Sequence, residues 1–168
     1  MARTVDPYRF TTPGTKRVAQ AWIRREPPHD VPWTPLAKPL SECVVALVSS
    51  GAIAMRSDRP FDQEGERRDP WWGDPTHRVL PRTATSSDVA VYHLHVDVSH
   101  TERDLNCMLP LERLLELERE GVVGRSAPSH YSFQGYLLDA REFLATSVPA
   151  MIRSMKSEGV DLALLVPV

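Results

Sequence analysis

Residues 161–168 read Asp-Leu-Ala-Leu-Leu-Val-Pro-Val, a continuous apolar run that follows a helix-like segment and Gly159. A run of this kind is typical of a strand that is buried on both faces, as the strands of a parallel sheet are. In open α/β sheets, ligands bind just beyond the carboxyl ends of such strands. We therefore expect the chain to reach its functional edge at Val168 and to be the front part of a longer polypeptide.

A second apolar run, Cys-Val-Val-Ala-Leu-Val-Ser at residues 43–49, is rich in valine and predicts a central strand of the same sheet. It leads directly into the small residues Ser-Gly-Ala at 50–52. Small residues at the carboxyl end of a strand let a ligand approach the backbone closely. A further strand is predicted over residues 89–95.

Three helices are predicted, over residues 15–25, 110–121 and 140–158. Pro110 suits a first helical turn and Gly121 a helix end, whereas Pro149 should kink or split the third helix. The side chains expected to face the core are Val18, Trp22 and Ile23, then Leu111, Leu114, Leu115 and Leu117, and finally Phe143, Leu144, Val148, Met151, Ile152 and Met155. This alternation predicts an α/β fold, a mostly parallel sheet with helices on both faces.

The chain divides into an irregular, proline-rich N-terminal arm over residues 1–40 and an α/β domain over residues 41–168. Seven of the fifteen prolines precede residue 40 and prevent regular hydrogen bonding there. We expect Trp22 and Trp33 to anchor this arm to the domain. Residues 56–87 are charged and rich in Pro, Asp and Arg, which predicts a long loop, and loops of that length are usually functional or disordered.

Composition excludes several classes of protein. The chain has 168 residues, 42% hydrophobic and 25% charged, which is typical of one globular domain. A net charge of −2 gives no reason to expect a nucleic-acid partner. No apolar run approaches the roughly 20 residues needed to cross a bilayer. The N-terminus also lacks the apolar core of a secretion signal, so we expect a cytoplasmic protein.

The two cysteines, Cys43 and Cys107, are too few for a disulfide framework or a closed zinc site. They agree with a reducing compartment. Cys107 could be a nucleophile, but the sequence supplies no electropositive setting for a reactive thiol, and free cysteine is commonly a small buried hydrophobe.

The densest polar cluster is Tyr-His-Leu-His-Val-Asp-Val-Ser-His at residues 92–100. If the strand continues through it, His93, His95 and Asp97 share one face. They could be metal ligands, a general acid–base set, groups that bind an anionic substrate, or side chains satisfied by local hydrogen bonds.

A second polar cluster, residues 127–136, contains His130, Tyr131 and Ser132, and is bracketed by Pro128 and Gly135. Its residues are too polar for a core strand. They predict either an ordinary surface loop or the lining of a pocket.

The order of several short segments is more specific than any one of them. They are VALVSSGAI at 45–53, DRPFD at 58–62, GDPTHRVLP at 73–81, HLHVD at 93–97, DLNCMLP at 104–110, EGVVG at 120–124 and APSHYSFQG at 127–135. This succession resembles the selenoprotein B family of the glycine, sarcosine, betaine and D-proline reductases, especially its shorter, proline-reductase-like members. The resemblance covers residues 43–168.

The resemblance implies reductive cleavage of a carbon–nitrogen bond in an amino acid or amine derivative. A selenocysteine or cysteine attacks the carbon next to a carbonyl group, and thioredoxin-like or other dithiol partners regenerate it. In the shorter members this nucleophile directly follows a strand like the one ending at Val168. Selenocysteine is encoded by UGA, ordinarily read as a stop, so we hypothesise that the chain is truncated at its own catalytic codon. No other cofactor is expected.

The resemblance also implies a substrate-binding set and a partner reductase subunit. The residues of this set are His93, His95, Asp97, Asp104, Asn106, His130, Tyr131 and Ser132. Two alternatives stay open: a nucleophile-free domain that binds a small molecule or serves as an accessory subunit, and a metal-dependent enzyme that uses His93, His95 and Asp97.

Overall fold

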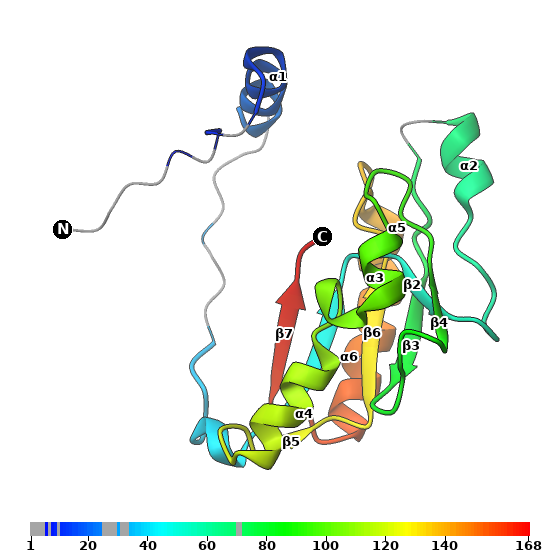
Figure 1. The fold of residues 1–168 in the computed structure, drawn as a ribbon. Helices are drawn as coiled ribbons and strands as arrows, with labels where there is room; N and C mark the ends of the chain where they lie inside the picture. The colour runs from blue at the N-terminus through cyan, green and yellow to red at the C-terminus, as the bar shows by residue number, and fades with distance from the viewer. Residues whose placement is uncertain (1–5, 7, 10, 25–29, 31–33, 70–71) are drawn as a thin grey trace. The chain divides into compact units, whose positions relative to one another are not determined.

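The apolar run after Cys43 forms β1 (Val44–Ser49), the central strand of the sheet in the computed structural model (Figure 1). The structure describes residues 6, 8, 9, 11–24, 30, 34–69 and 72–168. They fall into two units, Met1–Pro35 and Leu36–Val168.

The first unit contains the helix α1 (Pro13–Ile23), which confirms the predicted helix with its bounds shifted by two residues. Val18 and Ile23 are more than half exposed, so the prediction that they are buried is wrong. The expectation for Trp33 and for the side chain of Trp22 lies outside the described residues.

In the second unit, a five-stranded sheet confirms the predicted α/β class. β1 pairs in parallel with β5 (Arg125–Ser126), β6 (Ser129–Phe133) and β7 (Leu162–Val166). Because β7 runs along most of β1, β5 and β6 share the opposite side of that strand. β3 (His77–Pro81) lies antiparallel to β6. A separate ribbon pairs β2 (Ile53–Met55) with β4 (Val89–Val91).

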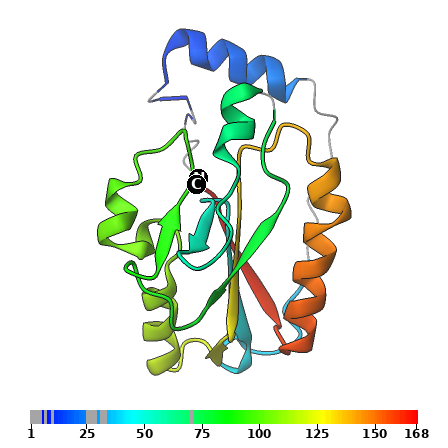
Figure 2. The same ribbon diagram turned by 90° about the vertical axis from the view of Figure 1, so that its right-hand side faces the viewer.

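Alternate side chains of β1 supply the core on both faces of the sheet, as the period of two requires. Val45 and Leu47 pack in the same cluster as Leu111 and Leu114 of α4 (Leu111–Arg119). Ala46 and Val48 pack in another cluster with Met151 of α6 (Ser147–Ser157). Figure 2 shows the yellow-green α4 and the orange α6 on opposite sides of the sheet.

The predicted helices of this unit are confirmed, but their bounds and some of their buried residues differ from the prediction. Gly121 follows α4 with φ of +71°, the left-handed conformation expected at a helix end. The helix predicted over 140–158 is split into α5 (Arg141–Ala145) and α6, and Pro149 lies in the first turn of α6, where it breaks no hydrogen bond. Leu117, Leu144 and Ile152 are exposed rather than buried.

Three predictions about strands and loops are wrong. The segment 56–87 is not one loop, because it contains α2 (Gln63–Arg68) and β3. β4 ends at Val91, so residues 92–97 are not a strand. β7 is not buried on both faces: it is an edge strand, and Leu164 and Leu165 are 49% and 71% exposed.

The remaining helical elements are short. They are the 3-10 turns η1 (Leu40–Glu42) and η2 (Leu105–Cys107) and the helix α3 (Ser99–Arg103). Among the described residues, no helix has both the length and the apolar character needed to cross a membrane.

Candidate functional site

The carboxyl ends of β1, β6 and β7 meet at Ser50. The Ser50 amide donates to the Val166 carbonyl (3.1 Å), and the Gly135 amide donates to the Ser50 carbonyl (2.9 Å). The Ser50 hydroxyl accepts from the amide of Val168 (2.8 Å). A Cβ at Gly135 would lie 2.9 Å from the Ser50 Cβ, so this approach requires glycine. Open α/β sheets bind their ligands at this edge. In this chain, the strand ends at the edge are hydrogen-bonded to one another through Ser50.

The backbone just past β1 has an unusual conformation at Ala52, whose φ is +52°. Few residues other than glycine and asparagine adopt this region, and such strain is often found at functional sites. The Ala52 amide donates to the Phe133 carbonyl, and the Ala52 carbonyl accepts from the Tyr92 amide, both at 2.9 Å. Ala52 thus joins the end of β6 to the start of the histidine segment.

His93 and His95 lie in a turn beyond β4 rather than on one face of a strand. The His95 amide donates to Nδ1 of His93 (3.2 Å), and the two rings are 6.0 Å apart, edge to face. The His95 ring also packs on Tyr136, with 4.5 Å between centroids. Because Tyr136 follows Gly135, this contact brings His95 next to the strand ends at Ser50.

Glu66 of α2 is the buried partner of His95. Its side chain is 3% exposed; Oε1 lies 2.7 Å from His95 Nε2, and Oε2 accepts from the side-chain amide of Gln134. A buried carboxylate is costly unless it is paired and hydrogen-bonded. The contact with Glu66 fixes the orientation of the His95 ring through Nε2.

The polar contacts continue from Gln134 to Asp74. The Asp74 amide donates to Oε1 of Gln134 (2.6 Å), and the Asp74 carboxylate accepts from the amides of Asp62 (2.9 Å) and Thr76 (2.8 Å). Glu66, Gln134 and Asp74 are not among the predicted site residues. Glu66 lies in a charged segment that shows no apolar pattern, and its partners are 29 and 68 residues away in the chain.

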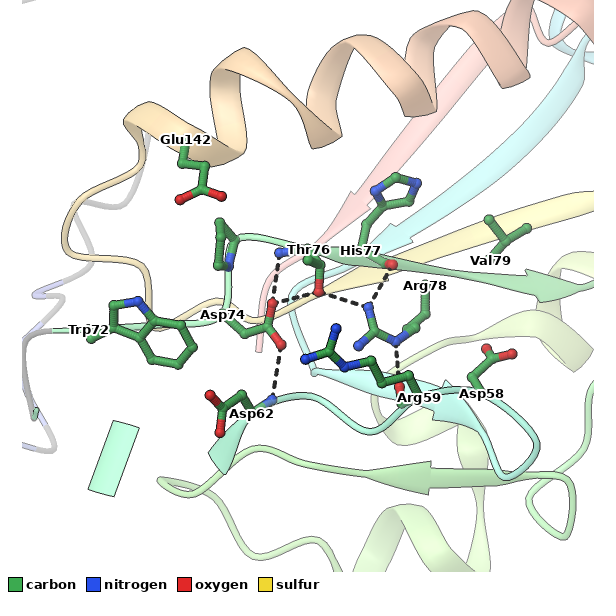
Figure 3. Close-up of a pocket in the computed structure, with 11 residues that line it drawn as sticks. Asp58, Arg59, Asp62, Trp72, Asp74, Thr76, His77, Arg78, Val79 and Glu142 are labelled. Carbon is green, nitrogen blue, oxygen red and sulfur yellow. Dashed lines mark hydrogen bonds between the residues drawn. The ribbon is translucent and has the colours of Figure 1, made fainter. Parts of the chain in front are cut away.

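Next to Asp74 lies a pocket of about 590 Å³ (Figure 3). It is lined by Asp58, Arg59, Asp62, Trp72, Asp74, Pro75, Thr76, His77, Arg78, Val79 and Glu142. Arg78 is stacked on Phe61, 4.2 Å from the ring centroid, and donates to the carbonyls of Arg59 and Pro60. The pocket therefore contains an immobilised guanidinium group.

The pKa values of three histidines are lowered, which favours their neutral form. Burial lowers the pKa of His93, and the neighbouring His95 lowers it further while Glu66 opposes the shift. Burial also lowers the pKa of His77, with a contribution from Arg78. The pKa of His130 falls to about 4, mainly because of burial and secondly because of Arg82.

Asp97, Asp104 and Asn106 are not brought to the strand ends with His93 and His95. Oδ1 of Asp97 accepts from the Ser99 amide at the start of α3 (3.0 Å). Asp104 accepts from the amide of Asn106 (2.9 Å), and Asn106 in turn accepts from the amide of Glu112 (3.0 Å). Asp104 is the N-cap of η2, and Asp97 and Asn106 accept from backbone amides in the first turns of α3 and α4.

His130, Tyr131 and Ser132 are fully buried in β6, so the prediction that they are too polar for a core strand is wrong. Nδ1 of His130 accepts from the Leu47 amide, and the Ser132 hydroxyl accepts from the Ile53 amide, each at 2.9 Å. His130 also contacts the Ser126 hydroxyl at 3.1 Å. Polar side chains fit this strand because they satisfy backbone groups of its neighbours.

Within the described residues, no group of three or more His, Cys, Asp or Glu side chains is arranged to hold a metal ion. His93, His95 and Asp97 do not converge, which removes the geometric basis of the metal-dependent alternative. Cys43 is buried and Cys107 is exposed, and both are free thiols.

The structure thus defines an α/β protein with polar side chains gathered near the carboxyl edge of its sheet, the edge where open α/β sheets bind their ligands. Two curated proteins are similar to this chain. One is the D-proline reductase subunit gamma of Acetoanaerobium sticklandii, 34% identical over 133 residues, which are 79% of this chain. The other is the glycine reductase complex component B subunit gamma of Carboxydothermus hydrogenoformans, 28% identical over 138 residues, or 80% of this chain.

These relatives confirm the family indicated by the sequence resemblance, that of the glycine and D-proline reductase subunits. The match spans 52% of the first relative and 30% of the second, so the chain corresponds to about half the length of the first. No protein-family model matches the chain. No solved structure is detectably similar to it.

Proposed function

We propose that this chain is the substrate-facing part of a reductase subunit that cleaves a C–N bond of an amino acid or amine derivative. The observation that carries the proposal is His95, held by the buried Glu66 beside the strand ends at Ser50. The names of the two relatives make D-proline and glycine the first substrates to assay.

The proposed nucleophile is a selenocysteine or cysteine that follows Val168. It would adjoin Ser50, which the Val168 amide contacts, and Gly135, whose neighbour Tyr136 packs on His95. The nucleophile forms a bond to the carbon next to the carbonyl group as the C–N bond breaks, and the amine nitrogen takes a proton. A thiol then attacks the nucleophile, the carbon takes a second proton, and a second thiol releases the disulfide. Two electrons and two protons of the dithiol thus convert C–N into C–H and N–H.

His95 would supply the proton to the leaving nitrogen. The Glu66 carboxylate holds the ring at Nε2 (2.7 Å), which would leave Nδ1 to face the substrate. His93, whose pKa is lowered by burial, would act as a neutral hydrogen-bonding group beside it. General acid catalysis of this kind contributes about 10²–10⁴ to the rate.

The test is the rate of C–N cleavage by the complete subunit, assembled with its partners and supplied with a dithiol. We expect His95→Asn and Glu66→Gln to lower kcat about 100-fold or more. His100→Asn, on exposed α3, is the matched control and should keep full activity. Unchanged rates in both site variants would contradict the proposed role of His95.

The position of the nucleophile is tested by sequencing about 300 bases of genomic DNA past the Val168 codon, enough for several further helix-and-strand units of about 30 residues each. A TGA codon followed by an in-frame extension, or a cysteine codon, supports the proposal. A TAA or TAG codon would contradict it.

A nucleophile-free binding domain or accessory subunit is the second candidate, favoured by the preformed 590 Å³ pocket. Substrate binding without turnover in the fully assembled system would support this alternative. For either function we propose a cytoplasmic location, a partner reductase subunit and, for the reductase, a thioredoxin-like or other dithiol donor.

A further inference from the structure

We propose that the pocket of Figure 3 binds a small zwitterion, with the cationic nitrogen between Trp72 and Glu142 and the anionic group at Arg59 and Arg78. The inference rests on the proposed function for its class of ligand, an amine or amino acid. Neither Ser50 nor His95 lines this pocket, so the inference assigns that ligand a second site, apart from the strand ends, and an orientation in it.

The first end of the pocket combines an aromatic ring with negative charge. Figure 3 shows Trp72, Asp62 and Glu142 toward this end, and Asp74 close by. A Cβ at Gly65 would lie 2.4 Å from the Trp72 ring, so the indole packs directly on the backbone of α2 and is held in place. A ring face beside carboxylates attracts ammonium groups through cation–π and Coulomb interactions.

Glu142 is the carboxylate available to a ligand at this end. Asp74 is occupied by backbone amides and by the Thr76 hydroxyl, and Asp62 accepts from the Gly65 amide. The Glu142 side chain has no hydrogen bond or ion pair within the part of the chain that the structure describes. Its neighbour Arg141 is committed to Asp139, with N–O distances of 2.5–3.0 Å.

The other end of the pocket is cationic. Nε and the two terminal nitrogens of Arg78 donate to three carbonyls and the Thr76 hydroxyl, at 2.7–3.0 Å. These partners are neutral, and no carboxylate among the described residues pairs with either Arg78 or Arg59. Asp58 also lines this end of the pocket.

The pocket thus separates an unpaired carboxylate next to an aromatic ring from two guanidinium groups without acidic partners. A ligand with one positive and one negative group would compensate both ends at once. A simple anion would meet three carboxylates near Trp72, and a simple cation would meet the arginines. Charge complementarity therefore selects a zwitterion over either single ion.

The test measures the dissociation constants of three probes for the purified 168-residue chain by ligand-observed NMR. The probes are 6-aminohexanoate, hexylammonium and hexanoate. We expect 6-aminohexanoate to bind most tightly. Glu142→Gln should weaken 6-aminohexanoate and hexylammonium about tenfold, the effect of losing one charge-assisted hydrogen bond, and leave hexanoate unchanged or tighter. Arg59→Gln should weaken 6-aminohexanoate and hexanoate instead.

Glu102→Gln and Arg103→Gln, both on exposed α3, change the same charges outside the pocket and should alter no dissociation constant. Equal binding of all three probes, no binding of 6-aminohexanoate, or the same response to both pocket variants would overturn the proposal. This result is separable from the proposed reaction: a subunit whose C–N cleavage depends on His95 but whose chain fails the probe test loses only the pocket assignment.

Discussion

At the scale of single residues, the structure assigns very different roles to its histidines. His95 is half exposed and paired with a buried carboxylate. His130 is fully buried and accepts a hydrogen bond from the backbone of β1. The sequence shows both as histidines in polar clusters, and the difference depends on contacts between segments far apart in the chain. His130 meets Leu47 across 83 residues. Such contacts are not visible in local sequence patterns.

His130 should make stability depend on pH. Its pKa is about 4 in the folded chain, against about 6.5 unfolded. Because the unfolded chain binds the extra proton, the free energy of unfolding is highest above pH 6.5. It should fall by about 3 kcal/mol as the pH drops to 4. Urea denaturation at several pH values measures this slope.

The control for this prediction is His130→Asn, whose Oδ1 can accept from the Leu47 amide without titrating. This variant should be less stable at pH 7 and should lose most of the slope between pH 6.5 and 4. An unchanged slope would mean that another group causes the acid sensitivity.

Gly135→Ala should destabilise the chain by about 1–3 kcal/mol, the usual cost of overpacking. The added Cβ would lie 2.9 Å from the Cβ of Ser50, at the junction of the strand ends. Ser50→Gly removes that contact, so the double variant should recover part of the loss. Additive effects in a double-mutant cycle of urea denaturation would contradict the proposed clash.

At the scale of elements, patterns with a strong period were predicted well. The apolar run of β1 and the leucines of α4 correctly predict a strand and a helix. In both elements most of the buried side chains are apolar, so the sequence pattern follows the burial pattern. α2 and β3 were missed, since α2 has the sequence QEGERR and its one buried side chain is a charged residue, Glu66. β6 was missed because its polar side chains bond to neighbouring strands. Because α2 and β6 were not predicted, Glu66 on α2 and Gln134 just after β6 were not predicted as site residues either.

α2 depends on its N-cap, so Asp62→Ala should loosen the helix that carries Glu66. The Asp62 carboxylate accepts from the Gly65 amide (2.9 Å), and loss of such a cap costs about 1 kcal/mol. We expect faster hydrogen exchange at the amides of α2 and weaker pairing of Glu66 with His95. Asp62→Asn, which keeps a capping oxygen, is the control. Equal exchange rates in both variants would show that the cap is not needed.

At the scale of the whole molecule, the sheet of the second unit has an open edge. Among the residues that the structure describes, β7 pairs only with β1, and Leu164 and Leu165 are exposed on a strand of five apolar residues. Exposed apolar edge strands pair with other chains unless they are covered.

We expect the 168-residue chain to associate through β7 when it is purified alone. Light scattering coupled to size exclusion should give masses above the monomer mass of 18.9 kDa. Leu165→Lys, a charge on the edge strand, should shift the chain toward the monomer. Leu138→Lys, at an exposed leucine outside the sheet, is the control. A monodisperse monomer of the unmodified chain would contradict this expectation.

The most direct test of the proposed chemistry is the stoichiometry of the reaction. The complete subunit with its partners is supplied with a dithiol and with D-proline or glycine, and cleaved C–N bonds and disulfide are quantified together. We expect one disulfide per cleaved bond, and loss of both products in His95→Asn. Cleavage without dithiol oxidation, or substrate binding with no cleavage at all, would contradict it.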